Sequence, residues 1–271
     1  MDKLQAFYEK YKIDEFYEKQ KNLNFEHPIR PFQPERHKKL SHGVIPGFRN
    51  YDLWFERYRS AVEVMKAKNV IKPGDEVLDV GCGEGFFKIF FDALYDGELK
   101  WNGVEVWKSR AAFCRHIGYT NVDEVDLEKG KLPYEDETFD VLIASHVIEH
   151  LPNPDEILRE FARVLKKGGV MLVATPTKLP VIAHIGAWIH NMNKRNRGET
   201  QQAFTARKLK RFTLKALGLP KSAIVDRRGF RIISGRKKLP IENWTWFYRF
   251  SKFLGRNCMF FVPEINLIVK K

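Results

Sequence analysis

The stretch Val77-Leu78-Asp79-Val80-Gly81-Cys82-Gly83-Glu84-Gly85 decides how this 271-residue chain folds. An apolar run leads into a turn with a glycine at every second position, and Phe86-Phe87 then open a helical pattern. Glycine adopts left-handed backbone and lets the main chain approach a ligand closely. The spacing is Asp-x-Gly-x-Gly-x-Gly, whereas dinucleotide-binding loops carry Gly-x-Gly-x-x-Gly to seat a pyrophosphate. The motif therefore predicts a strand-turn-helix unit for a nucleotide-like ligand that lacks a pyrophosphate.

Short β-rich runs alternate with helical stretches around this motif. Such alternation predicts an α/β fold with a mostly parallel sheet and helices on both faces. The Lys166-Lys167-Gly168-Gly169 stretch is expected to end one helix, because cations and glycine favour helix C-termini. The predicted strands are 76–80, 99–105, 121–125, 139–144 and 170–174, and the predicted helices are 85–94, 109–116, 147–151 and 154–165.

Less regular segments flank the alternating region. Apolar residues at helical spacing predict one or two amphipathic helices in residues 1–21, and a Pro- and Gly-rich segment follows at 24–50. Two late strands, 223–233 and 259–269, predict an antiparallel hairpin beside the parallel sheet. We expect an N-terminal helical cap over residues 1–60 and a main domain over 61–271. The remaining predicted elements are helices at 51–69 and 205–217, a substrate-lid insertion at about 178–215 and an aromatic stretch at 244–253.

The net charge of +13 is unevenly distributed. Residues 1–177 sum to −4, whereas residues 178–271 hold 21 Lys and Arg against four Asp and Glu, a net +17. This asymmetry predicts an anionic partner for the last third, either a phosphorylated small molecule, a lipid surface or a nucleic acid. The alternative is a solvated basic surface that aids solubility.

The aromatic stretch 244–253 alternates with Arg249, Lys252 and Arg256. This composition suits a membrane surface or a lipid-tailed substrate. Packing of its apolar face in the core is the alternative.

The cysteine content and the N-terminal sequence indicate the setting of the protein. The three cysteines, Cys82, Cys114 and Cys258, form no Cys-x-x-Cys pair and no zinc-ligand spacing. The first 20 residues mix charges and lack the apolar core of a secretion signal. We expect a soluble, cytoplasmic protein without a transmembrane segment.

Acidic residues end three successive predicted strands. Asp79, Glu105 and Asp126 would therefore lie at one edge of a parallel sheet and form one cleft. Asp79 suits a cationic group, Glu105 can accept the hydrogens of ribose hydroxyls, and Asp126 can accept from an adenine amino group. The alternative is a tight turn with incidental acids.

Four motifs resemble the class I S-adenosylmethionine (SAM)-dependent methyltransferases, a broad group that includes quinone-biosynthesis O-methyltransferases. The motifs are 79–85, 132–141, 145–154 and 163–169, and the resemblance covers about 72–176. It implies a Rossmann-like fold with a mostly parallel seven-stranded sheet and an antiparallel C-terminal hairpin. It also implies SAM as methyl donor and S-adenosylhomocysteine as product. We expect donor contacts at Asp79, Gly81, Cys82, Gly83, Gly85, Glu105, Val106, Asp126, Leu127, Ser145 and His146.

Two histidines are candidates for the catalytic base. His146 and His150 follow the fourth predicted strand, and imidazole titrates near neutral pH. Alternatively, they support the following short helix. His146, Glu149 and His150 stand at i, i+3 and i+4, where they could present ligands to a divalent ion. Small-RNA 2′-O-methyltransferases hold magnesium with a Glu-x-x-Glu-His pattern, from which this chain departs at His146, so no metal is expected.

The expected function is methyl transfer from SAM to an anionic small-molecule, lipid-linked or glycan acceptor, with O-methylation favoured. His184 and His190 either line the acceptor pocket or pack against the sheet edge. Two alternatives stay open. The first is an RNA methyltransferase, supported by the basic last third, and the second is a SAM-binding regulatory protein without catalytic activity.

Overall fold

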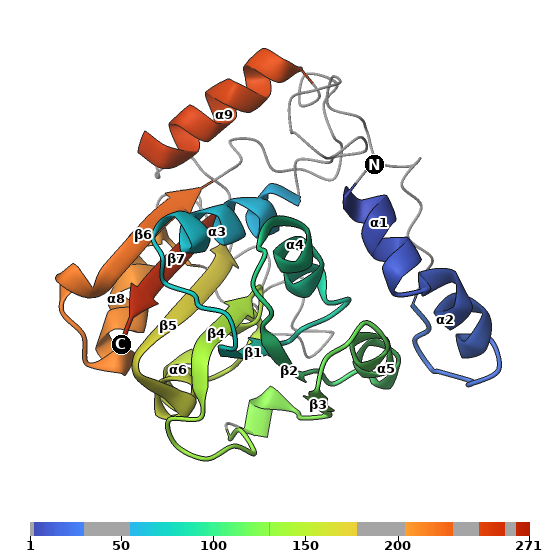
Figure 1. Cartoon of the computed structure of the whole chain (residues 1–271). Helices are drawn as coiled ribbons and strands as arrows, with labels where there is room; N and C mark the ends of the chain where they lie inside the picture. The colour runs from blue at the N-terminus through green and yellow to red at the C-terminus, as the bar shows by residue number, and fades with distance from the viewer. Residues whose placement is uncertain (1–2, 30–54, 130, 178–203, 230–243, 258–263) are drawn as a thin grey trace, which may run out of the picture. The chain divides into compact units, whose positions relative to one another are not determined.

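The computed structural model describes residues 3–29, 55–129, 131–177, 204–229, 244–257 and 264–271. Figure 1 labels the helices and strands of the chain. The chain divides into two compact units. The first comprises residues 1–125 and 235–250, and the second comprises residues 126–234 and 251–271. The seven strands are ordered β3-β2-β1-β4-β5-β7-β6.

Three parallel strands form the sheet of the first unit. They are β1 (Glu76–Val80), β2 (Lys100–Val104) and β3 (Asn121–Asp123). Four of the five residues of β1 are buried, because a strand covered on both faces tolerates a continuous apolar run. The helices of this unit are α1 (Lys3–Lys10), α2 (Ile13–Gln20), α3 (Glu56–Ala67), α4 (Phe86–Leu94) and α5 (Lys108–His116).

Aromatic contacts hold the helices of the first unit together. Tyr58 of α3 stacks on Phe86 and Phe90 of α4, with ring centroids 5.4 and 5.8 Å apart. Tyr17 of α2 stacks on Phe113 of α5 at 6.4 Å. Aromatic pairs of this kind add about 0.5–1.5 kcal/mol beyond the burial of their area. The helical spacing in residues 1–21 thus reflects two real helices, and their buried faces belong to the core of this unit.

The sheet of the second unit is mixed. Strand β4 (Phe139–Ser145) pairs in parallel with β5 (Leu165–Pro176), and β7 (Glu264–Lys270) lies antiparallel between β5 and β6 (Ile224–Gly229). The predicted fold class is therefore confirmed, including the antiparallel C-terminal hairpin. The helical segments are η3 (Leu127–Lys129), η4 (Ile148–His150), α6 (Pro154–Val164), α8 (Ala206–Leu217) and η5 (Lys221–Ala223).

The predicted role of the Lys166–Gly169 stretch as a helix end is wrong. The Lys166-Lys167-Gly168-Gly169 stretch is part of β5 and does not cap the preceding helix, since α6 ends at Val164 and Leu165 is already extended. The main chain of Lys271 explains the difference: Gly168 N donates to Lys271 O, and Lys271 N donates to Gly169 O, both at 2.8 Å. This long-range pairing satisfies the backbone groups and extends the strand.

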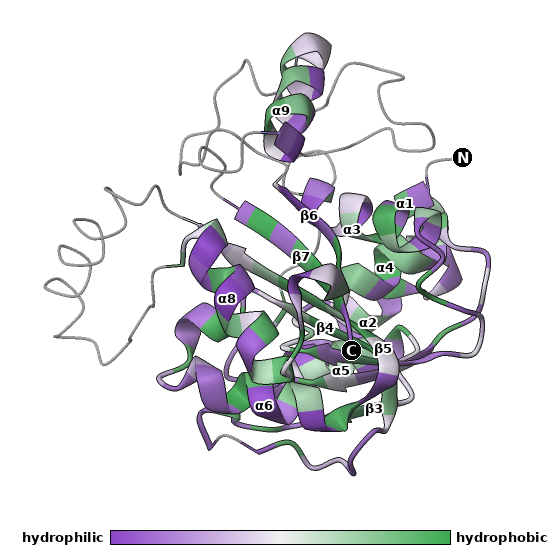
Figure 2. Cartoon of the chain, turned by 90° about the vertical axis from the view of Figure 1, so that its left-hand side faces the viewer, coloured by the Kyte–Doolittle hydropathy of each residue, from purple (hydrophilic) through white to green (hydrophobic). Residues whose placement is uncertain are grey.

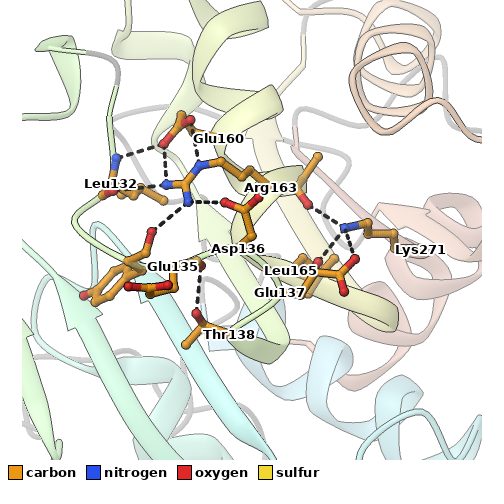
Figure 3. Close-up of polar contacts among 11 residues, drawn as sticks. Leu132, Glu135, Asp136, Glu137, Thr138, Glu160, Arg163, Leu165 and Lys271 are labelled. Atoms are coloured by element: carbon orange, nitrogen blue, oxygen red, sulfur yellow. Dashed lines mark hydrogen bonds and ion pairs between the residues drawn. The ribbon is translucent and has the colours of Figure 1, made fainter.

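Arg163 of α6 organises the loop before β4 (Figure 3). Its guanidinium donates to the carboxylates of Glu160 and Asp136 and to the carbonyl oxygen of Leu132. The planar guanidinium of arginine can donate to several acceptors in different directions, whereas the compact ammonium of lysine is less suited to this. The hydrogen bond from Arg163 lowers the pKa of Glu160.

Helix α9 (Thr245–Asn257) follows the described strand β6 in the chain and contributes residues to both units. It shows hydrophilic and hydrophobic residues along its length (Figure 2). Within the described ranges, no helix combines the length and apolar character needed to traverse a bilayer. Most of the predicted insertion, with His184 and His190, lies outside the described residues, and so do Cys258 and most of the segment 24–50.

Gly168 and Gly169 provide a matched pair for testing the pairing of β5. A Cβ on Gly169 would lie 2.9 Å from the carbonyl oxygens of Asp140 and Lys166, and backbone atoms cannot easily move aside. Gly168 has a φ of 78° but open space around it. We expect Gly169→Ala to lower the free energy of unfolding by about 3 kcal/mol, and Gly168→Ala by about 1 kcal/mol. Urea denaturation measures both, and equal losses would contradict the close approach.

Candidate functional site

The glycine turn after β1 needs three left-handed residues. Gly81, Gly83 and Gly85 have φ values of 65°, 57° and 64°, a region that costs other L-residues about 1 kcal/mol or more. Gly85 also lies against a neighbour, because a Cβ there would meet Ile117 at 2.5 Å. The turn therefore presents backbone at its surface, as the glycine spacing predicts.

Asp79 lies in β1 with its side chain buried. The hydroxyl of Tyr119 donates to Asp79 Oδ2 at 2.8 Å, and among the described residues no cation pairs with this carboxyl. Burial raises the pKa of Asp79 to about 7, the charge of Glu105 adds to this, and the Tyr119 hydrogen bond opposes it. A buried carboxyl without a cation is a suitable partner for a positively charged ligand group.

Glu105 directly follows β2 and ties it to the glycine turn. One carboxylate oxygen accepts from Gly83 N at 2.8 Å, and the other accepts from Val106 N and Trp107 N at 2.9 and 3.0 Å. A carboxylate offers about four acceptor sites. Glu105 thus retains capacity for about one more donor in this arrangement.

A cavity of about 720 Å³ lies in the first unit next to these residues. Two of its lining residues are close in sequence to the site: Glu84 directly follows Gly83, and Trp107 is two residues after Glu105. Its lining combines acidic, basic and aromatic side chains, namely Glu26, His27, Pro28, Ile29, Glu84, Trp107 and Arg110. Burial raises the pKa of Glu84, and the charge of Arg110 partly opposes this.

An N-terminal segment closes one side of this cavity. Ser109 Oγ donates a short hydrogen bond to the carbonyl oxygen of His27, and the His27 ring meets the Trp107 ring edge-on at 4.1 Å. Sequence reasoning missed His27, Trp107 and Arg110. The position of Trp107, two residues after Glu105, was a usable signal for it. Nothing in the sequence pattern marked His27.

The two described cysteines lie beneath the turn. Cys114 Sγ is 3.4 Å from Gly83 O, and both Cys82 and Cys114 are buried. Their mutual hydrogen bond and burial raise the thiol pKa of Cys82, and burial raises that of Cys114. These thiols pack the turn and are not activated as nucleophiles.

The other predicted donor contacts belong to the second unit. Asp126 is exposed and accepts from Glu128 N at 3.0 Å, so it caps the short helix that begins at Leu127. Ser145 ends β4, and its buried hydroxyl has no hydrogen-bond partner among the described residues. An unsatisfied buried hydroxyl is a candidate ligand contact.

His146 is held in an unusual conformation between two buried acids. Its φ is 59°, and its N–H donates to Ala174 O at 2.9 Å. Nδ1 lies 3.3 Å from Glu149 Oε1, and Nε2 lies 2.7 Å from Glu264 Oε1. The second contact is an ion-pair distance without the alignment of a hydrogen bond. Thr175 Oγ1 donates to the other oxygen of Glu149, which fixes that carboxylate.

His150 is placed quite differently from His146. Its side chain is 59% exposed, and Nε2 lies 4.0 Å from Glu149 Oε1. Glu264 was not predicted, although an acid in the apolar predicted strand 259–269 was a usable signal. Across the described part of the chain, no three His, Cys, Asp or Glu side chains form a group that could hold a metal, and this covers His146, Glu149 and His150.

Comparisons with known proteins agree with this geometry. Residues 78–173 match the family described as a methyltransferase domain. A probable SAM-dependent methyltransferase of Mycolicibacterium smegmatis is 32% identical over half of each chain. A demethylmenaquinone methyltransferase of Alkalihalophilus pseudofirmus is 29% identical over 51% of this chain and 63% of its own. The chain thus spans between about half and two thirds of these relatives.

Solved structures share the fold. A putative sarcosine dimethylglycine methyltransferase from Galdieria sulphuraria has a TM-score of 0.55 at 16% identity, covering 79% of this chain and 85% of that one. A SAM-dependent methyltransferase from Mesorhizobium loti has a TM-score of 0.53 at 16% identity, over 78% and 98%. The family match, the relatives and the fold together identify residues 78–173 as a class I SAM-dependent methyltransferase domain.

Proposed function

We propose that the chain transfers a methyl group from SAM to an anionic small-molecule, lipid-linked or glycan acceptor, by O-methylation. The observation that carries this proposal is the buried Asp79 carboxyl beside the left-handed glycine turn, which lacks a cationic partner among the described residues. SAM carries an α-ammonium group that would supply the missing charge. When bound, SAM also provides a methyl group on a positively charged sulfur.

Each donor residue has a role that its chemistry supports. Asp79 would bind the α-ammonium group, and Glu105 would accept from a ribose hydroxyl with its remaining capacity. Asp126 would accept a hydrogen bond from the adenine amino group. The buried hydroxyl of Ser145 would form a hydrogen bond with the ligand. The backbone of the turn, Cys82 included, and residues Val106 and Leu127 would line the nucleoside.

His146 would remove the proton from an acceptor hydroxyl with Nδ1, because Nε2 is buried against Glu264 Oε1. An imidazolium forms when the ring takes that proton, and the carboxylates of Glu149 and Glu264 lie 3.3 and 2.7 Å away to stabilise it. His150 is a weaker candidate, because it is exposed and 4.0 Å from Glu149. Removing the hydroxyl proton makes the oxygen a better nucleophile, which favours O-methylation.

The charge of the described C-terminal elements supports an anionic acceptor. Helix α8 carries five Lys and Arg residues and no acid. The names of two relatives, the demethylmenaquinone methyltransferase and a phosphatidylethanolamine N-methyltransferase of Cereibacter sphaeroides (28% identity over 45% of this chain and 61% of its own), also refer to lipid-related molecules. The same basic helix suits RNA, which keeps an RNA methyltransferase as the second candidate.

Asp79→Asn tests the donor site. The amide keeps the size of the side chain but cannot carry the negative charge, so we expect SAM and S-adenosylhomocysteine to bind at least tenfold more weakly. Isothermal titration calorimetry measures both affinities. Asp96→Asn is the matched control, because Asp96 is exposed and should not change binding. Unchanged affinity in Asp79→Asn would reject the proposed donor site.

The raised pKa of Asp79 predicts a pH dependence of donor binding. Asp79 holds a proton below about pH 7, and binding an ammonium group requires that proton to leave. SAM affinity should therefore rise between pH 5.5 and 7, by up to about tenfold per unit. Tyr119→Phe removes a hydrogen bond that lowers this pKa, so the rise should move to higher pH. A flat profile in both proteins would exclude the ionisation of Asp79 from binding.

His146→Gln tests the proposed base and the acceptor class together. A positioned base contributes about 100-fold or more, so methyl transfer from labelled SAM into cell extract should fall by that factor. His150→Gln should lose less than tenfold. Labelled product that survives ribonuclease supports a small-molecule, lipid-linked or glycan acceptor, and label destroyed by ribonuclease supports the RNA alternative. No turnover of SAM in wild-type protein would favour a regulatory role.

A further inference from the structure

Exposed aromatic side chains concentrate on α9. Among the described residues seven large hydrophobic side chains are exposed, and four of them lie within ten positions of one another. Trp244, Trp246, Phe250 and Phe253 are 53%, 56%, 46% and 61% exposed. Single exposed hydrophobic residues are ordinary, but three such residues on α9, with Trp244 directly before it, mark a contact surface.

The exposed aromatics share one face of the helix. Trp246, Phe250 and Phe253 stand at i, i+4 and i+7, which places them in one stripe. Phe247 and Ser251, on a different stripe, are buried. One face of α9 is therefore buried, and a second, hydrophobic face is exposed.

The start of α9 is fixed by a buried polar network in the first unit. Tyr248 Oη accepts from Arg59 at 2.6 Å and donates to Glu56 Oε2 at 3.1 Å. Arg59 and Glu56 are themselves paired at 2.7 Å, and Glu56 is fully buried. Because Tyr248 is held in this way, Trp246 and Phe250 cannot turn inward without breaking the network.

Basic residues border the aromatic stripe. Arg249, Lys252 and Arg256 stand at i, i+3 and i+7 and form the neighbouring stripe of α9; Arg249 and Arg256 are exposed. The sequence of α9 contains no Asp or Glu. Cations beside a hydrophobic face are the arrangement that interfacial helices use on anionic bilayers.

We infer that this face of α9 docks on the surface of a bilayer that contains anionic lipid. Tryptophan and phenylalanine partition into the headgroup boundary, and arginine beside them binds lipid phosphates. The net +17 of residues 178–271 would add long-range attraction to the same surface. The inference does not depend on the methyl acceptor.

Vesicle sedimentation with the full chain tests this inference. Wild-type protein should pellet with phosphatidylglycerol–phosphatidylcholine vesicles and much less with phosphatidylcholine alone. Replacing Trp246, Phe250 and Phe253 by Ser should weaken binding at least tenfold. Arg249→Gln with Arg256→Gln should weaken binding to the anionic vesicles about 25-fold, at about fivefold per charge. Leu23→Ser, which also removes an exposed hydrophobic side chain, is the matched control and should change nothing.

Circular dichroism and S-adenosylhomocysteine binding establish that each variant is folded, since the substituted side chains are exposed. Vesicle binding that survives the triple substitution, or that is equal on both vesicle compositions, would overturn the inference. Light scattering without lipid provides the third readout. A wild-type dimer that the triple substitution dissociates, with no vesicle binding, would make this face an interface between two copies and would also overturn it.

Discussion

The structure of the candidate site depends on burying two acids beside one glycine turn. Asp79 loses hydration in β1 and, among the described residues, accepts from the Tyr119 hydroxyl alone, whereas Glu105 accepts from three backbone N–H groups. The two acids therefore differ in function although both follow the same strand pattern. Glu105 stabilises the turn, and the negative form of Asp79 lacks a positive partner in the part of the chain that the structure describes. In the proposed function, that imbalance is the physical basis for binding a cationic nucleoside.

The N-terminal part of the chain is structurally continuous with this site. Helices α1 and α2 pack on α4 and α5, and the following segment places His27 against Trp107 and Ser109. The helical spacing of residues 1–21 and the Pro- and Gly-rich segment after them predict an N-terminal helical cap over residues 1–60. In the described residues the helices share a core with the glycine turn, so this segment contributes both to stability and to the wall of the cavity.

Much of the fold was predictable because its signals are local. Strand β1 agrees with its prediction at both ends, and α4 begins one residue after the glycine turn, as hydrophobic patterning requires. The prediction for the Lys166–Gly169 stretch failed because the partner of this stretch, Lys271, is about one hundred residues away in sequence. Tyr119 and Glu264 were missed for the same reason: each acquires its role from a contact with a distant residue, which spacing along the chain does not encode.

At His146, the cost of the backbone conformation opposes the proposed role of the ring as a base. A φ of 59° carries a backbone cost for any residue other than glycine, and this chain has a histidine there, between two buried acids. Glycine at this position would relax the backbone but would remove the imidazole. Selection for thermal stability alone would therefore favour the replacement of His146. A variant engineered for stability should keep histidine at position 146 if the activity is to be retained.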